Sequence, residues 1–195
     1  VTKISVNPFV AKKLYENTKN FSEKEIIEII YKLSDIDIGI KIKGYERVWN
    51  AIESIAFEDK NVNGVFLNIQ ENKNSILDGV VIEISDEELE VLKIREKNYS
   101  CIVIKSTDVL DETIKSDLIA FMTTKKEKIA FIGQENTFIP IKYIEIVKEA
   151  LKNYDDNFIK GFEKTFENYN FPLKDGSYTF TDSLQNKIAR EGIKN

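Results

Sequence analysis

The spacing of apolar residues changes along this chain, and the change limits the folds that it can adopt. In the central part apolar residues alternate with polar ones, as in strands that bury one face. This pattern predicts short strands within residues 38–45, 65–69, 79–84, 99–105, 118–123 and 128–131. The glycine-rich phosphate loop and the strand–helix rhythm of a dinucleotide-binding fold are both missing, so a doubly wound sheet is not expected.

Helices are predicted on both sides of these strands. One begins at Asn7 and a second after Ser22, since both residues can cap a helix. Beyond the strands, a helix begins at Pro140, which suits a helix start. The last helix carries Phe158, Phe162 and Phe166 at four-residue spacing, which is typical of a face that packs on the core.

These elements predict an α+β fold, a small mixed β-barrel of about six strands flanked by helices. The 195 residues are enough for one domain, which we place at residues 1–170. Residues 171–195 form a more polar C-terminal tail with a short helix predicted over 182–191. The sequence leaves open whether this tail packs on the barrel, exchanges with a second copy or stays mobile.

The composition is that of an ordinary soluble globular protein, for which we expect a cytoplasmic location. The formal net charge of -5 argues against nucleic acid as the main partner. No apolar run approaches the ~20 residues of a membrane span, and the first residues contain no signal-peptide core, so no membrane partner is expected. A small molecule is the expected partner, and nothing in the sequence indicates an oligomeric state.

The chain contains no histidine, which narrows the chemistry that it can perform. Ser-His-Asp catalysis, Cys-His catalysis and the common zinc sites are excluded. Acid–base chemistry must therefore come from Asp, Glu, Lys or Tyr, and we expect neither a metal nor a cofactor. The single cysteine, Cys101, lies in an apolar strand and is expected to be a buried thiol in a reducing compartment, not a nucleophile.

A short helix after the third predicted strand places a carboxylate among apolar residues. Ser85 and Glu88 form a capping box at its start. At about 100° per residue, Glu96 falls between Leu89 and Leu92, on the face that should meet the core.

Such a carboxylate either finds a partner or keeps its proton to a higher pH. The second outcome is what an acid–base catalyst requires. The alternative is that Glu96 emerges into water at the helix end or pairs with Arg95 or Lys97.

Several segments match one family in the same order. Residues 78–84 form a D-G-V-V-I-E-I strand, the capped helix ends at Glu96, and Tyr99 follows. Residues 44–50 look like a G-Y-x-x-x-F-N strand, residues 63–69 look like the strand after it, and residues 142–151 resemble a closing helix. Over residues 1–165 the chain thus resembles the gamma-glutamylcyclotransferase-like family.

The resemblance implies a transferase reaction that needs no metal or cofactor. Glu96 stands where the family has its catalytic glutamate, which takes a proton from the α-amino group of a γ-glutamyl compound. The amine then attacks the γ-carbonyl within the same molecule, closing 5-oxoproline and releasing an amine or amino acid. A carboxylate of raised pKa can accept this proton and return it to the leaving nitrogen.

The resemblance also suggests substrate-binding residues. Ser5, Val6 and Asn7 correspond to part of the family's substrate loop, although helix capping would also account for Asn7. Tyr99 could bond to the carboxylate or line the pocket, and packing of a strand tyrosine is the alternative.

The chain departs from the family at this loop. The family carries Tyr and Gly there, but neither residue precedes Ser5. Glycine lets a backbone approach a ligand closely, and losing an oxyanion donor costs on the order of 10²–10³ in rate in other enzymes. Lys93 and Lys97 also replace the usual Asp and Gly. Because the sequence begins with Val1 and not methionine, it stays open whether the loop was shortened or altered.

Three hypotheses follow from the sequence. The first is an active gamma-glutamylcyclotransferase-type enzyme. The second is a catalytically inactive relative that binds or sequesters a small metabolite in the barrel pocket. The third is an interaction protein in which Glu96 is an ordinary surface or paired residue.

Overall fold

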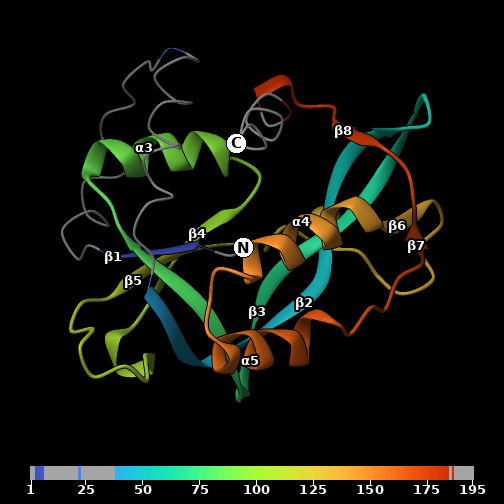
Figure 1. Cartoon of the computed structure of the whole chain (residues 1–195). Coiled ribbons are helices and arrows are strands. Elements are labelled where there is room, and N and C mark those ends of the chain that lie inside the picture. Colours follow the sequence, from blue (N-terminus) through green and yellow to red (C-terminus); the bar gives the residue numbers. More distant parts are fainter. Residues whose placement is uncertain (1–2, 7–21, 23–37, 185, 187–195) are drawn as a thin grey trace.

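A long antiparallel hairpin organises the fold (Figure 1). The computed structural model describes residues 3–6, 22, 38–184 and 186. The hairpin consists of β2 (Ile38–Phe57) and β3 (Lys60–Glu83). Its turn residues, Glu58 and Asp59, both have positive φ, 48° and 62°. Positive φ at both turn residues gives the turn a backbone twist that matches the right-handed twist of the two strands.

The remaining strands extend this hairpin on both sides. They are β1 (Lys3–Val6), β4 (Ser100–Ile104), β5 (Leu118–Met122), β6 (Thr137–Pro140), β7 (Leu173–Lys174) and β8 (Tyr178–Phe180). The order is β4-β5-β1-β3-β2-β8, and β6 pairs with both β3 and β7. β1 runs parallel to the end of β3 and antiparallel to β5.

The α+β class is therefore confirmed, whereas barrel closure is not. The strand order of the described residues is open at β4 and β8. One isolated bridge, Ile42 with Val109, joins β2 to the segment after β4. Beside it, the Leu110 amide donates to the Lys41 carbonyl at 2.8 Å.

The central strands are longer than the sequence predicts, because β2 has 20 residues and β3 has 24. Polar side chains pair across the hairpin where the alternation is interrupted. The Glu46 carboxylate accepts hydrogen bonds from Gln70 at 2.6 Å and Asn72 at 2.8 Å. Asn68 donates to Asn50 at 2.9 Å. These bonds satisfy polar groups that would otherwise favour a turn.

Two sequence predictions in the strand region are wrong. Residues 128–131 do not form a strand: a 3₁₀ helix (Lys126–Lys128) is followed by a single bridge between Ile129 and Ala51. Cys101 is exposed instead of buried. It lies on β4, at one end of the strand order, where alternate side chains point away from the sheet.

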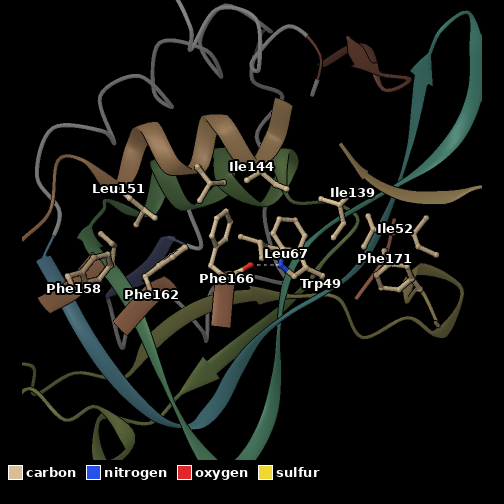
Figure 2. Packing of buried hydrophobic residues seen from close by; sticks show 14 residues of the cluster. Trp49, Ile52, Leu67, Ile139, Ile144, Leu151, Phe158, Phe162, Phe166 and Phe171 are labelled. Atoms are coloured by element: carbon tan, nitrogen blue, oxygen red, sulfur yellow. Dashed lines mark hydrogen bonds between the residues drawn. The ribbon is translucent and has the colours of Figure 1, made fainter. Parts of the chain in front are cut away.

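The described helices are α3 (Asp86–Arg95), α4 (Ile141–Leu151) and α5 (Asp156–Phe166). As predicted, α4 starts directly after Pro140 and α5 buries its three phenylalanines. Figure 2 shows them packed between the hairpin and α4, with Trp49 Nε1 donating to the Phe166 carbonyl at 2.7 Å. None of the described helices is long and apolar enough to cross a membrane. The helices predicted from Asn7 and Ser22 lie outside the described residues, apart from Ser22 itself.

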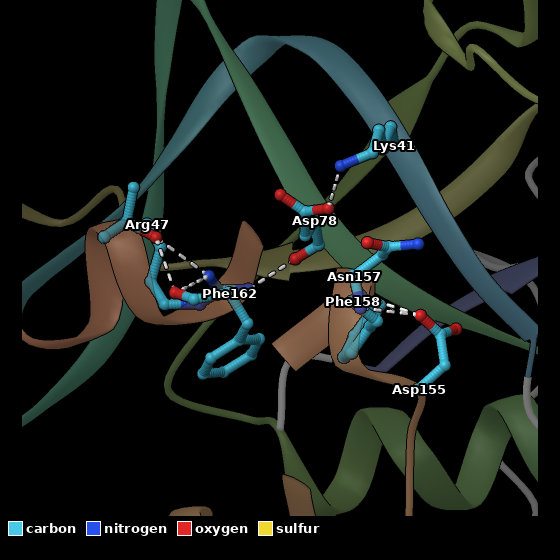
Figure 3. Close-up of polar contacts among 8 residues, drawn as sticks. Lys41, Arg47, Asp78, Asp155, Asn157, Phe158 and Phe162 are labelled. Carbon is cyan, nitrogen blue, oxygen red and sulfur yellow. Dashed lines mark hydrogen bonds and ion pairs between the residues drawn. The ribbon is translucent and has the colours of Figure 1, made fainter. Parts of the chain in front are cut away.

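A buried arginine fastens α5 to the hairpin (Figure 3). The Arg47 guanidinium lies 3.5 Å from the centre of the Phe162 ring, and it donates to Thr165 Oγ1 at 2.9 Å and to the Asp78 carbonyl. The Asp78 carboxylate pairs with Lys41. Burial lowers the pKa of Arg47 to about 10, so this group stays charged at neutral pH.

The described part of the C-terminal tail packs on this domain. Phe171 is buried in the same cluster as Trp49. β7 pairs with β6, and β8 pairs with the end of β2. The helix predicted over 182–191 begins at residue 183, and most of it lies outside the described residues.

Candidate functional site

The end of α3 positions Glu96. The predicted capping box is present: the Glu88 amide donates to Ser85 Oγ at 3.3 Å, and the Ser85 amide donates to the Glu88 carboxylate at 2.7 Å. At the other end, the Glu96 amide donates to the Leu92 carbonyl at 2.8 Å, and the Tyr99 amide donates to the Glu96 carbonyl at 2.8 Å. These bonds hold residues 96–99 in a tight connection between α3 and β4.

The Glu96 side chain is largely enclosed and has a partner. Its side chain is 22% exposed, and Oε1 lies 3.3 Å from Arg95 Nε. The pairing with Arg95 that the sequence left open is therefore present. Because the contact is partly exposed, the ion pair is weak enough for a charged ligand group to compete with it.

A second carboxylate, Glu53, lies near Glu96. Glu53 is on β2 and is 6% exposed. Asn98 Nδ2 donates to both of its carboxylate oxygens, at 3.3 and 3.1 Å, and Lys128 Nζ lies 3.6 Å from Oε2. Burial raises the pKa of Glu53, and the negative charge of Glu96 raises it further. Glu53 thus retains a proton more readily than an exposed glutamate does.

Two phenols share the electrostatic environment of these carboxylates. Burial raises the pKa of Tyr99 well above its ordinary value, and the charges of Glu53 and Glu96 add to the shift. Burial likewise raises the pKa of Tyr143, on α4, to about 12, and Glu96 contributes. Both hydroxyls are therefore neutral donors at physiological pH. We call Glu53, Glu96, Tyr99 and Tyr143 the Glu53–Glu96 cluster.

A buried aromatic ring borders this cluster. The Phe66 ring on β3 lies 5.0 Å from the Tyr143 ring, measured between centroids. Gly64, which pairs with Glu53 across the hairpin, makes room for it, because a Cβ on Gly64 would lie 2.7 Å from the Phe66 ring. A glycine opposite Glu53 therefore lets an aromatic ring pack beside the carboxylate.

The structure places the other predicted residues as follows. Tyr99 belongs to the cluster. Ser5 and Val6 lie on β1 and are in register with Ile82 and Glu83 of β3, just before α3. Asn7 lies outside the described residues. A contact of Ser5, Val6 or Asn7 with a substrate stays a prediction.

Sequence reasoning missed Glu53 and Tyr143. The available signal for Glu53 was its place between Ala51 and Ile55, which lie in one apolar cluster, but the predicted strand ended before it. For Tyr143, the sequence predicts only a place on the closing helix. Tyr143 lies near the cluster because α4 packs against the hairpin, and a local sequence pattern cannot predict such tertiary packing.

The shallow surface depression on α5 is separate from this cluster. It is lined by Lys160, Glu163, Lys164, Glu167 and Asn168. Among the described residues, no group of three Asp, Glu or Cys side chains is arranged to hold a metal ion.

Comparison with known proteins does not assign the chain to a family. No protein-family model matches it. No curated protein matches its sequence significantly. Its function is therefore inferred from the residues of the cluster together with the motifs in the sequence.

Proposed function

We propose that this protein is a gamma-glutamylcyclotransferase-type enzyme, which converts a γ-glutamyl compound to 5-oxoproline and releases an amine or amino acid. Glu96 is its general acid and base. The observation that carries the proposal is the position of Glu96: it is mostly enclosed at the end of a capped helix, near Glu53 and two neutral phenols.

Each residue has a defined part in this reaction. Glu96 accepts a proton from the substrate's α-ammonium group, and the freed amine attacks the γ-carbonyl carbon. As the bond from this carbon to the leaving nitrogen breaks, Glu96 returns the proton to that nitrogen. The attacking nitrogen loses a second proton as it becomes the ring amide, and the released amine takes up this proton and departs as an ammonium ion. Tyr99 and Tyr143 donate hydrogen bonds to the carbonyl oxygen while it carries negative charge. The reacting groups belong to one molecule, so holding it folded supplies much of the acceleration.

We also propose that the sheet curves into a barrel-like shell around an apolar interior. The bridge between Ile42 and Val109 supports this, because it links the two sides of the sheet. Ile42, Ile69, Ile104 and Val109 are buried together in one cluster. A rigid shell of this kind would hold the cluster residues in place.

The test is release of 5-oxoproline from a panel of γ-glutamyl amino acids, peptides and amines. We expect Glu96→Gln to lower kcat by about 10²–10⁴, the usual contribution of a positioned acid–base group, without lowering the melting temperature. The matched control is Glu90→Gln, on the same helix and paired with Lys93. It should leave release unchanged. Release that persists in Glu96→Gln would contradict the assignment.

The second candidate is an inactive relative that binds or sequesters a small metabolite. The contact of Glu96 with Arg95 favours it, since a guanidinium at 3.3 Å occupies one carboxylate oxygen. A ligand-dependent rise in melting temperature without 5-oxoproline release would identify this case. Neither release nor binding by any member of the panel would instead favour an interaction protein.

A further inference from the structure

The lysine that directly follows Glu96 is paired with the C-terminal segment and not with Glu96. Lys97 Nζ pairs with the Asp182 carboxylate. The side chains of these two residues are 49% and 25% exposed, so their ion pair is in contact with solvent. Among the described residues, Glu96 itself forms its ion pair with Arg95. Of the two neighbouring cations that could pair with Glu96, one therefore does so and the other binds Asp182.

Hydrogen bonds hold Asp182 in this position. Its carboxylate accepts from the Leu184 amide at 3.1 Å, which is the bond of a helix cap. The residue before it, Thr181, donates to the Ser54 carbonyl on β2 through its amide and its hydroxyl, both at 3.1 Å. Figure 1 shows the chain leaving β8 and turning toward the end of α3. The Asp182 carboxylate is thus fixed between β2 and the end of α3.

A second cation on Glu96 would oppose the proposed chemistry. An opposite charge within about 4–6 Å favours the charged form of a carboxylate, so the carboxylate takes up a proton less readily. Arg95 Nε already lies 3.3 Å from Glu96 Oε1. Lys97 is adjacent to Glu96 on its other side, and its ammonium group is carried on a long, flexible side chain. Without another partner, Lys97 could therefore reach the same carboxylate.

We propose that Asp182 is a positioning residue of the site: it binds the Lys97 ammonium group and thereby keeps this cation away from Glu96. The inference rests on the function proposed above, because it gives Asp182 a part in the proton transfer by Glu96. Asp182 acts through Lys97 and does not touch the substrate.

The other titratable groups near Glu96 do not take this part. From the elements packed around it, Glu96 interacts with Glu53 on β2, Tyr99 before β4 and Tyr143 on α4. Both phenols are neutral at physiological pH, and the Glu53 carboxylate is paired with Lys128. Among these groups, Asp182 is therefore the one that can neutralise Lys97.

The experiment compares the wild-type chain with Asp182→Asn, which removes the charge and keeps an oxygen for the Leu184 amide. We expect kcat for 5-oxoproline release to fall about tenfold, with little change in KM. The pH at which Glu96 takes up its proton, read from the NMR shift of its carboxyl carbon, should also fall. The control is Asp155→Asn, since Asp155 caps α5 in the same way, and it should change neither quantity.

Adding Lys97→Gln to Asp182→Asn gives a result that a merely structural role would not produce. The displaced cation is then removed, so kcat and the proton uptake of Glu96 should return toward their wild-type values. A double variant as impaired as Asp182→Asn alone would overturn the inference. A single variant in which Glu96 titrates as it does in the wild type would overturn it as well.

A cross-link tests the ion pair in the wild type, without any variant. A carbodiimide joins a lysine amine to a carboxylate in contact with it: an amide forms, and the carbodiimide takes up the water that is lost and becomes a urea. Peptide mass spectrometry should identify a link between Lys97 and Asp182. Absence of this link, or a link from Lys97 to Glu96 in its place, would contradict the inference.

Failure of the proposed function is a separate result. A wild type that releases no 5-oxoproline from any γ-glutamyl compound would reject the reaction. The titration of Glu96 in the two variants and the cross-link would still show whether Asp182 keeps Lys97 away from it. Release that is equally fast in the wild type and in Asp182→Asn would retain the reaction and reject the part of Asp182.

Discussion

The negative charge of Glu53 is unfavourable for the folded state. It is buried on β2, and its pKa is raised mainly by that burial, although Lys128 and the hydrogen bond from Asn98 oppose the shift. A group whose pKa is raised on folding favours the folded state at low pH. That contribution is lost as the pH rises through the folded-state pKa.

We therefore expect Glu53→Gln to be more stable than the wild type at pH 7–8, because glutamine is neutral and keeps an oxygen for Asn98. The advantage should shrink as the pH falls below the ordinary glutamate pKa, where the wild-type group is protonated in both states. Chemical denaturation across this pH range measures the difference. Glu149→Gln, on an exposed part of α4, is the control and should change stability little. A less stable Glu53→Gln at neutral pH would show that the pair with Lys128 outweighs burial.

Glu96 and Glu53 differ in how far the sequence alone could predict their positions. The sequence could predict that Glu96 is partly enclosed, because the helix period places it between Leu89 and Leu92. Both leucines are buried. Glu53 could not, because its inward position depends on the strand continuing past Asn50. The sequence could suggest Arg95 as a partner for Glu96, but the partners of Glu53 come from residues 98 and 128, far away in the chain.

Among the elements, the contact of α5 with β3 depends on a glycine. A Cβ on Gly161 would lie 2.6 Å from both carboxylate oxygens of Asp78. Asp78 cannot easily move, because its carboxylate pairs with Lys41 and its carbonyl accepts from Arg47.

Gly161→Ala should therefore destabilise the protein even though alanine favours a helix by about 1 kcal/mol over glycine. Overpacking costs typically 1–3 kcal/mol, so we expect a net loss of about 1–2 kcal/mol. Urea denaturation measures it. Lys160→Ala, the exposed neighbouring position, should stay within about 0.5 kcal/mol of the wild type. A stabilised Gly161→Ala would mean that α5 can shift away from Asp78 at no cost.

Element types were more predictable than element lengths. The capping box of α3 and the aromatic face of α5 are local patterns, and the structure contains both. Strand lengths were underestimated because Glu46, Asn68 and Gln70 interrupt the apolar alternation. Their side chains bond to one another across the hairpin, so the strands continue. That compensation exists only once the partner strand is in place.

For the whole molecule, the order of the strands in the sheet could not be predicted from the sequence. β1 lies between β3 and β5, far from both along the chain, and such non-local pairing leaves no local signal. This strand order places β3 in contact with all four apolar clusters. β3 contributes Leu67, Ile69, Ile82 and Phe66 to four different apolar clusters. Since every cluster needs β3, we expect the described domain to unfold as one unit.

Phe138→Ala tests this expectation. Phe138 is 1% exposed on β6, and its ring lies 4.8 Å from that of Phe57. It belongs to a different cluster from Trp49, the single tryptophan of the chain. Removing a buried phenylalanine side chain typically costs 3–5 kcal/mol. In a cooperative domain, Trp49 fluorescence and far-ultraviolet circular dichroism should report the same loss, with coincident transitions.

The control is Phe131→Ala, which removes an exposed ring and should leave both transitions within about 0.5 kcal/mol of the wild type. If Phe138→Ala shifted the circular dichroism transition but not the Trp49 transition, the cluster around Phe138 would unfold separately from the helical side of the hairpin. Glu53 lies on β2 between Ile52, which packs with Trp49, and Ile55, which packs with Phe138. Independent unfolding would then loosen the strand that holds Glu53, and the carboxylates of the proposed site would lose their fixed spacing.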